Sequence, residues 1–146
     1  MKIQDKDYYH GAALTQIIEH PQFTALNKVN KKYGHYLINH DIRLLVKLCT
    51  AMDSPWSYTF WPDDLTTIQQ DISAGAKTFI CLICGLDTIC ILNAEQIQML
   101  IDLDAAGSQW IRVEVHTKKG SLWVQGQRGE YHRAIPHNAF PDALFV

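Results

Sequence analysis

The sequence lacks an excess of charge of either sign. Thirteen lysines and arginines stand against 15 aspartates and glutamates, and the formal net charge at pH 7 is −2. A surface this close to neutral exerts no strong long-range field on the phosphates of nucleic acids or of an anionic membrane. The composition therefore disfavours nucleic acid as a partner.

Long apolar runs are also lacking. No segment approaches the roughly 20 consecutive apolar residues of a membrane-spanning helix, and the N-terminal residues MKIQDKDYYHG contain no apolar stretch typical of a secretory signal. We therefore expect a cytoplasmic protein without a membrane partner. Because 47% of the 146 residues are hydrophobic, the chain can bury a core of its own, and we predict a single domain over residues 1–146.

Several enzyme signatures are absent as well. The chain contains no Gly-x-Gly-x-x-Gly or Walker A loop, no Gly-x-Ser-x-Gly elbow and no His-Glu-x-x-His pair. These absences lower the expectation of a common nucleotide-binding enzyme, serine hydrolase or zinc protease. The sequence predicts no catalytic residue and no cofactor.

Cysteine is sparse, and three of the four cysteines, Cys81, Cys84 and Cys90, lie in one apolar segment. Cys81 and Cys84 have the Cys-x-x-Cys spacing of a zinc knuckle or a redox dithiol. Zinc needs four ligands around one point, yet residues three apart on an extended strand point to opposite faces. A redox dithiol sits at a helix N-terminus, whereas this pair ends an apolar run. We interpret the thiols as reduced core residues and predict no metal site.

Apolar periodicity predicts a sheet of about five to eight strands. Alternation indicates a three-stranded antiparallel meander over residues 36–38, 42–49 and 56–60, with a turn at Asn39 to Asp41. The last of these strands places its aromatic residues on one face, where we expect them to pack in the core. Further strands are predicted over residues 79–84, 89–92, 110–116, 122–125 and 131–135, and Lys118-Lys119-Gly120 joins two of them.

Helical spacing predicts about three helices. The first begins at Asp7 as its cap and buries Leu14, Ile17 and Ile18; the spacing of Phe23, Leu26 and Val29 favours a further turn or two. The other two begin at Pro62 and at the capping box of Asn93 with Gln96. Together these elements predict an α+β fold, with a mostly antiparallel sheet and helices packed mainly on one face.

A polar row lies on the strand at 110–116. Arg112, Glu114 and His116 alternate with three β-branched residues, so they share one strand face with Trp110. An acid beside an imidazole can act in acid/base catalysis, and the same alternation is typical of the solvent face of an outer strand. We take Trp110, Arg112, Glu114 and His116 as the candidate binding surface.

Aromatic residues exceed what the predicted core needs. Trp61, Trp110 and Trp123 add apolar surface that a small domain has difficulty burying. An exposed aromatic patch of this kind indicates a partner or a second copy of the chain. We therefore expect a homo-oligomer.

Lys47 interrupts an apolar strand, because Leu44-Leu45-Val46 precede it and Leu48 follows it. Its ammonium group must either find an acid or extend outward to water. On an alternating strand we favour the outward position.

Four segments carry a resemblance to known proteins: HGAAL (10–14), YGHYLINHDIRLLVK (33–47), PWSYTFWPDD (55–64) and HNAFP (137–141). They resemble short bacterial α/β proteins of unknown function that are carried as accessory genes on mobile elements. This resemblance supplies no catalytic residue. We expect a binding or protein-interaction module that self-associates.

The order helix, three antiparallel strands, helix, strand also resembles the core of the PD-(D/E)XK nucleases. Their chemistry implies an acid on the second strand and an acid-x-lysine on the third, which hold magnesium and the attacking water. Asp41 begins the second predicted strand, but Ser57 and Thr59 stand where the acid and lysine belong, and Lys47 lies one strand too early. The alternative function is a degenerate nuclease, or another phosphate-ester enzyme, built around Asp41 and Lys47.

Overall fold

The computed structural model describes residues 1–116 and 120–146. Within these residues, nine strands and three α-helices form an α+β fold in two mostly antiparallel sheets, which confirms the predicted class. The predicted connection over Lys118 and Lys119 lies outside the described residues. No helix in the described part is long and apolar enough to cross a membrane.

Sheet A has five strands, in the spatial order β1 (Leu26–Lys28), β2 (His35–Ile38), β3 (Ile42–Cys49), β5 (Lys77–Cys84) and β6 (Thr88–Asn93). Sheet B has four strands, in the order β4 (Trp56–Phe60), β7 (Gln109–Val115), β8 (Ser121–Gly126) and β9 (Ile135–Pro136). Among the paired strands described, only β3 and β5 run parallel. The helices are α1 (Asp5–Ile18), α2 (Pro62–Ser73), α3 (Ala94–Leu100) and the short 3₁₀ helix η1 (Asp142–Phe145).

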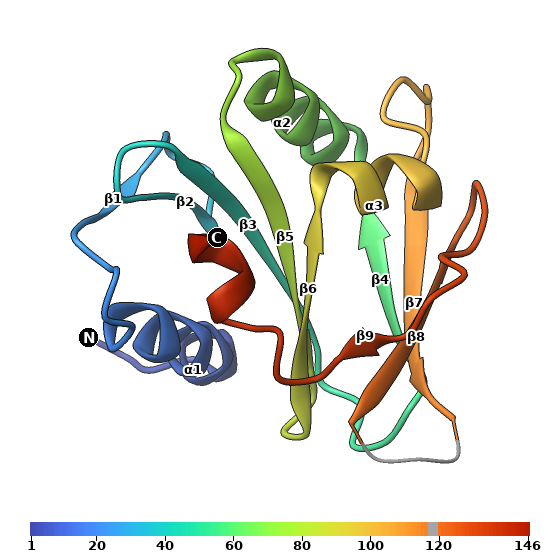
Figure 1. Ribbon diagram of the computed structural model, residues 1–146, viewed down its shortest axis with the longest axis horizontal. Helices are drawn as coiled ribbons and strands as arrows, with labels where there is room; N and C mark the ends of the chain where they lie inside the picture. Colours follow the sequence, from blue (N-terminus) through green and yellow to red (C-terminus); the bar gives the residue numbers. More distant parts are fainter. Residues whose placement is uncertain (117–119) are drawn as a thin grey trace.

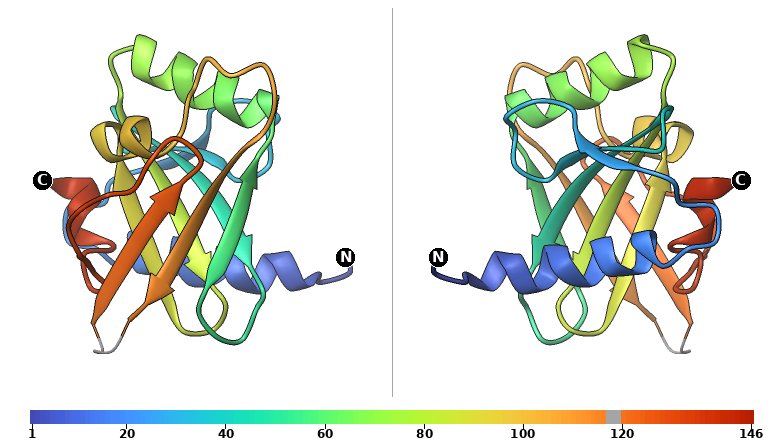
Figure 2. Two further views of the ribbon diagram at one scale, coloured as in Figure 1. Left: turned by 90° about the vertical axis from the view of Figure 1, so that its right-hand side faces the viewer. Right: turned by 90° about the vertical axis from the view of Figure 1, so that its left-hand side faces the viewer.

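Sheet A is the middle layer of the molecule. One of its faces packs on sheet B, and the other is covered by α1 and the C-terminal segment with η1 (Figure 1; Figure 2, right). Each face has its own apolar core. Strand β5 is buried on both faces, because Ile80 and Leu82 belong to the core between the sheets while Cys81 and Ile83 belong to the core under α1. This confirms the double burial that its continuous apolar run predicts.

Helices α2 and α3 close one end of the core between the sheets, with Leu65 and Ile68 from α2 and Ile97 from α3 buried there. The capping box of α3 is confirmed, since the Gln96 N–H donates to Asn93 Oδ1 and the Asn93 N–H donates to Gln96 Oε1, both at 2.9 Å. Relative to sheet A, α2 and α3 pack on the face that also packs on sheet B, at one end of the sandwich, and α1 packs on the opposite face (Figure 1).

The predicted meander was wrong in its third strand. Strand β4 pairs with β7 in sheet B, and the antiparallel meander of sheet A is β1, β2 and β3. The alternation of β4 does hold, because Trp56, Tyr58 and Phe60 are buried and the two residues between them are exposed. Alternation specifies which face of a strand is buried, but not which strand it pairs with, and the connection after Cys49 carries the chain to the second sheet.

The first helix differs in detail from its prediction. Gln4 precedes it, and Asp7 stands inside the first turn, where Asp7 Oδ2 accepts from the Gln4 N–H at 2.8 Å. The buried residues of α1 are His10, Ala13 and Ile17. The buried face of α1 therefore includes a histidine, which the prediction did not include, and it leaves Ile18 exposed.

Candidate functional site

The outer surface of sheet B is the side that faces away from sheet A. We call it the sheet-B face and define it by the outward side chains of β4, β7 and β8 and of the residue after β7: Ser57, Thr59, Trp110, Arg112, Glu114, His116, Trp123 and Gln125. None of the described helices covers it (Figure 2, left). All four predicted surface residues belong to this face.

Strand register brings the sheet-B face together from three strands. Arg112 is paired with Ser57 on one side and with Gln125 on the other, and Glu114 is paired with Trp123. Side chains directly opposite each other on antiparallel strands have Cβ atoms about 5 Å apart and interact. The face is therefore one continuous surface of aromatic, acidic and basic groups.

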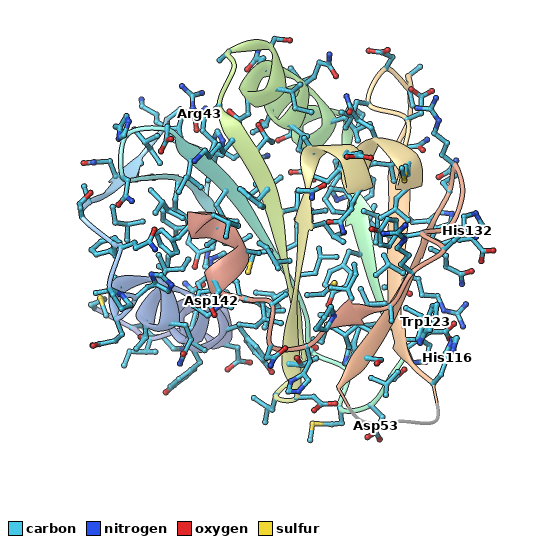
Figure 3. All side chains as sticks on the ribbon, in the orientation of Figure 1. Arg43, Asp53, His116, Trp123, His132 and Asp142 are labelled. Atoms are coloured by element: carbon cyan, nitrogen blue, oxygen red, sulfur yellow. The ribbon has the colours of Figure 1, made fainter. Side chains whose placement is uncertain are left out.

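The contacts on this face centre on Glu114. His116 Nε2 lies 3.1 Å from Glu114 Oε1, and Arg112 Nη2 lies 3.9 Å from Glu114 Oε2. The His116 ring stacks on the Trp123 ring, with centroids 5.2 Å apart and planes at 7°. Figure 3 shows His116 and Trp123 side by side on the flank of the molecule opposite to α1. Sequence reasoning missed Trp123 as a member because its place beside Glu114 depends on the register of two strands.

Arg112 and Trp110 are partly exposed to solvent on the sheet-B face. The guanidinium has five N–H donors in a fixed fork, but its Nε is buried without a hydrogen-bond partner in the described residues, and its ion pair with Glu114 is long. Trp110 is 40% exposed although its indole is a large apolar group. The exposed groups at the centre of this face are therefore the Arg112 side chain, which is 41% exposed, and the Trp110 indole.

The structure does not bring Asp41 and Lys47 together. Asp41 belongs to the turn before β3, and its carboxylate lies 3.6 Å from Lys77 Nζ. Lys47 lies toward the other end of β3 and donates to Asp64 Oδ2 at 2.8 Å. The expectation that Lys47 extends outward was wrong, because an acid on α2 satisfies its ammonium. In the described part of the chain, no group of three or more His, Cys, Asp or Glu side chains could hold a metal ion.

Sequence reasoning also missed a layer of ion pairs between α2 and sheet A. Asp71 accepts from Arg43 Nη1 at 3.0 Å, and its other oxygen lies 2.7 Å from His35 Nε2. Both Asp71 and His35 are 2% exposed. The signal was available in part, because Asp64 and Asp71 are seven residues apart and so share one helix face. Their basic partners on β2 and β3 could not be read from that spacing.

Asp64 occupies the second position in this layer. Its carboxylate accepts from Lys47, from Lys32 Nζ at 2.8 Å and from the Trp61 N–H at 3.0 Å. Burial alone would raise the pKa of Asp64, but the hydrogen bonds from Lys32 and Lys47, together with that from the Trp61 backbone, outweigh it and lower the pKa. The group is therefore a carboxylate at neutral pH, and it holds α2 against the sheet.

The cysteines lie where strand geometry predicts. Cys81 belongs to the core under α1, and Cys84 and Cys90 belong to the core between the sheets, so the Cys-x-x-Cys pair is divided between opposite faces of β5. The four cysteines are free thiols. Burial raises the pKa of the Cys84 thiol to about 12, and burial likewise raises the pKa values of Cys81 and Cys90.

Thiol labelling should distinguish Cys49 from the other three. Cys49 is only partly buried, so we expect it to react first with Ellman's reagent at pH 8, while the buried thiols react at least about 100-fold more slowly because they need an opening of the fold. The measurement is the release of the chromophore with time. The Cys49→Ser variant should lose the fast phase, and unfolding in guanidinium should expose every remaining thiol. A fast phase that survives in Cys49→Ser contradicts this assignment.

Comparisons with protein-family models, with curated proteins and with solved structures found no match to this chain.

Proposed function

We propose that this chain is a non-catalytic interaction module that forms a homodimer through the sheet-B face. The observation that carries the proposal is the uncovered face itself, on which exposed Trp110, the stacked Trp123 and an Arg–Glu pair lie side by side. Aromatic residues and arginine are the residue types enriched in protein interfaces and in their binding hot spots.

A second copy is the partner that the charges of this face favour. Arg112 and Glu114 have opposite signs and stand two residues apart on β7. In a two-fold symmetric contact the same patch meets itself, so an axis passing between these residues sets Arg112 of each copy against Glu114 of the other. The spare donors of Arg112 would then find a carboxylate, and the indole rings would be covered at the same time.

The size of the face sets the expected affinity. Three strands about 4.8 Å apart and about six residues long at 3.4 Å each span roughly 14 by 20 Å in projection. A standard interface buries about 800 Å² of accessible surface on each partner, about a tenth of the 8191 Å² of this chain. The face reaches that area only with the loops around it, and we therefore expect dissociation in the micromolar range.

Charge exchange tests the proposed dimer. In sedimentation equilibrium from about 1 to 300 μM, the range in which a micromolar dimer dissociates, Arg112→Glu and Glu114→Arg should each weaken dimerisation at least about tenfold, because like charges then face each other. The double variant carries the same pair in reverse and should restore dimerisation to within about threefold of the original chain.

Lys28→Glu is the matched control, since it reverses an exposed charge on β1, outside the sheet-B face. It should leave the dissociation constant unchanged. A chain that stays monomeric across the concentration range would rule out the homodimer. A double variant that dimerises as poorly as the single variants would place the contact elsewhere.

A further inference from the structure

A second site candidate lies outside the sheet-B face, where α1 crosses the edge of sheet A near the start of α2. Here a cavity of about 300 Å³ is lined by the side chains of Lys6, His10, Tyr33, Lys47 and Asp64 and by the neighbouring residues of β3. This volume is at the lower end of the range of ligand pockets. The cavity therefore suits a small molecule.

The cavity exists because β3 is longer than its neighbour. The pairing of β2 with β3 ends at His35 with Leu45, whereas β3 continues to Cys49 alongside β5. In the described part of the chain, the last residues of β3 thus have a strand partner on one side only. Gly34, with φ 81°, turns the chain away at this point, and a Cβ there would lie 3.0 Å from His10 Cε1, so the glycine leaves room for the imidazole.

His10 is the buried polar group of this cavity. The residue is 5% exposed, and its Nδ1 is buried without a hydrogen-bond partner among the described residues. Leaving such an atom unpaired is unfavourable, and a bound ligand or ion is one explanation for a polar atom of this kind. Burial, and then the positive charge of Lys6, lower the pKa of His10, and the opposing effect of Asp7 is smaller. The ring is therefore neutral at pH 7, with one donor and one acceptor nitrogen.

The lining of the cavity contains two lysines, Lys6 and Lys47, and one acid, Asp64. Lys6 Nζ lies 4.1 Å above the centre of the Tyr33 ring and has no ion pair with a described carboxylate. Lys47 gives one hydrogen bond to Asp64 and keeps further N–H donors. Asp64 is the acid of the lining, and Lys32, outside the lining, also pairs with it. Lys6 is thus the lysine of the lining that has no ion pair with a described acid, and Asp7 is the acid next to it in sequence.

We propose that this cavity binds the phosphate group of a small molecule, held by Lys6 and Lys47 with the His10 imidazole as a further hydrogen-bonding group and the Tyr33 ring beside them. A phosphate carries a charge of about −1.5 to −2 near pH 7 and three strong acceptor oxygens, which matches two ammonium groups with a neutral donor beside them. A carboxylate offers only two oxygens, so it would satisfy fewer of these donors than a phosphate does. The ligand is either free phosphate or a small phosphate monoester.

Titration of the full chain tests this site and separates the two sources. The probes are inorganic phosphate, glycerol 3-phosphate and uncharged glycerol, added at constant ionic strength while NMR follows the His10 and Tyr33 rings. We expect saturable shifts of both rings with phosphate, with glycerol 3-phosphate or with both. Tighter binding of glycerol 3-phosphate identifies an ester ligand, and equal or tighter binding of inorganic phosphate identifies the free ion.

Lys6→Gln is the variant of choice, because Lys6 is exposed and the variant keeps every ion pair of Asp64. It should weaken binding about tenfold, whereas Lys28→Gln, an exposed lysine on β1, should leave the affinity unchanged; the thermal midpoint of each variant reports its folding. The proposal is overturned if neither phosphate probe produces a saturable shift of the rings, if glycerol binds as well as glycerol 3-phosphate, or if folded Lys6→Gln binds phosphate as tightly as the original chain.

Discussion

Replacing Asp71 by alanine is expected to lower the free energy of unfolding by about 3–5 kcal/mol, the range seen when one partner of a buried ion pair is removed. Asp71 is 2% exposed and accepts from Arg43, and it also holds the buried His35 ring. The Nδ1 of His35 has no partner in the described residues, so removal of Asp71 leaves both ring nitrogens unpaired inside the fold. Urea denaturation followed by tryptophan fluorescence measures the loss.

Asp63→Ala is the matched control, because it makes the same chemical change on the same helix. Asp63 has a side chain that is 76% exposed and pairs with Lys32, which keeps Asp64 as its second partner. An exposed pair of this kind contributes at most about 1 kcal/mol. If Asp71→Ala cost no more than Asp63→Ala, the buried layer under α2 would not stabilise the fold as we argue.

The elements that sequence predicted well are those with local causes. The box of Asn93 and Gln96 lies within one turn, and the alternation of Trp56, Tyr58 and Phe60 lies within one strand, so neither depends on a distant part of the chain. The continuous apolar run of β5 indicated burial on both faces, and the structure has a core on each side. These signals were sufficient for the α+β class.

Predictions failed where the outcome depends on a distant partner. Leu26 has the spacing of a continuing helix with Phe23 and Val29, yet it lies in β1 and is paired with Ile38. The alternation of β4 fits an edge in either sheet, and its pairing with β7 joins residues 49 to 57 positions apart in sequence, from Phe60 with Gln109 to Trp56 with Val113. Alternation of apolar and polar residues with a period of two determines which face of a strand is buried, but it does not determine which strand pairs with it.

The candidate sites also divide into features with local causes, which the sequence predicted, and features that depend on distant partners, which it did not. Trp110 to His116 could be grouped from sequence, because period-two spacing puts them on one strand face, but the addition of Trp123 required the register of β8. The His10 cavity had no signal in the sequence. It is formed by α1, the turn at Gly34, the start of α2 and the end of β3 that β2 does not reach, and these segments are far apart in the sequence.

Gly126→Ala is expected to lower the free energy of unfolding by about 3 kcal/mol, near the upper end for overpacking a core. Gly126 ends β8 where it meets the last turn of α3, and a Cβ there would lie 2.2 Å from the Leu100 carbonyl oxygen and 2.8 Å from its carbon. Both atoms belong to the backbone, and the same oxygen accepts from the Arg128 N–H at 2.9 Å. The collision cannot be relieved by rotating a side chain, so α3 must move away from sheet B.

The same substitution at Gly107 separates this collision from the general effect of adding a methyl group. A Cβ at Gly107 meets nothing within 4 Å, and Gly107→Ala should change the free energy of unfolding by at most about 0.5 kcal/mol. Because α3 closes the core between the sheets, Gly126→Ala should also speed amide hydrogen exchange in α3 more than in α1, which packs on the other face of sheet A. Equal stability of the two variants, or faster exchange spread evenly over both helices, would show that the contact of Gly126 with Leu100 does not hold α3 in place.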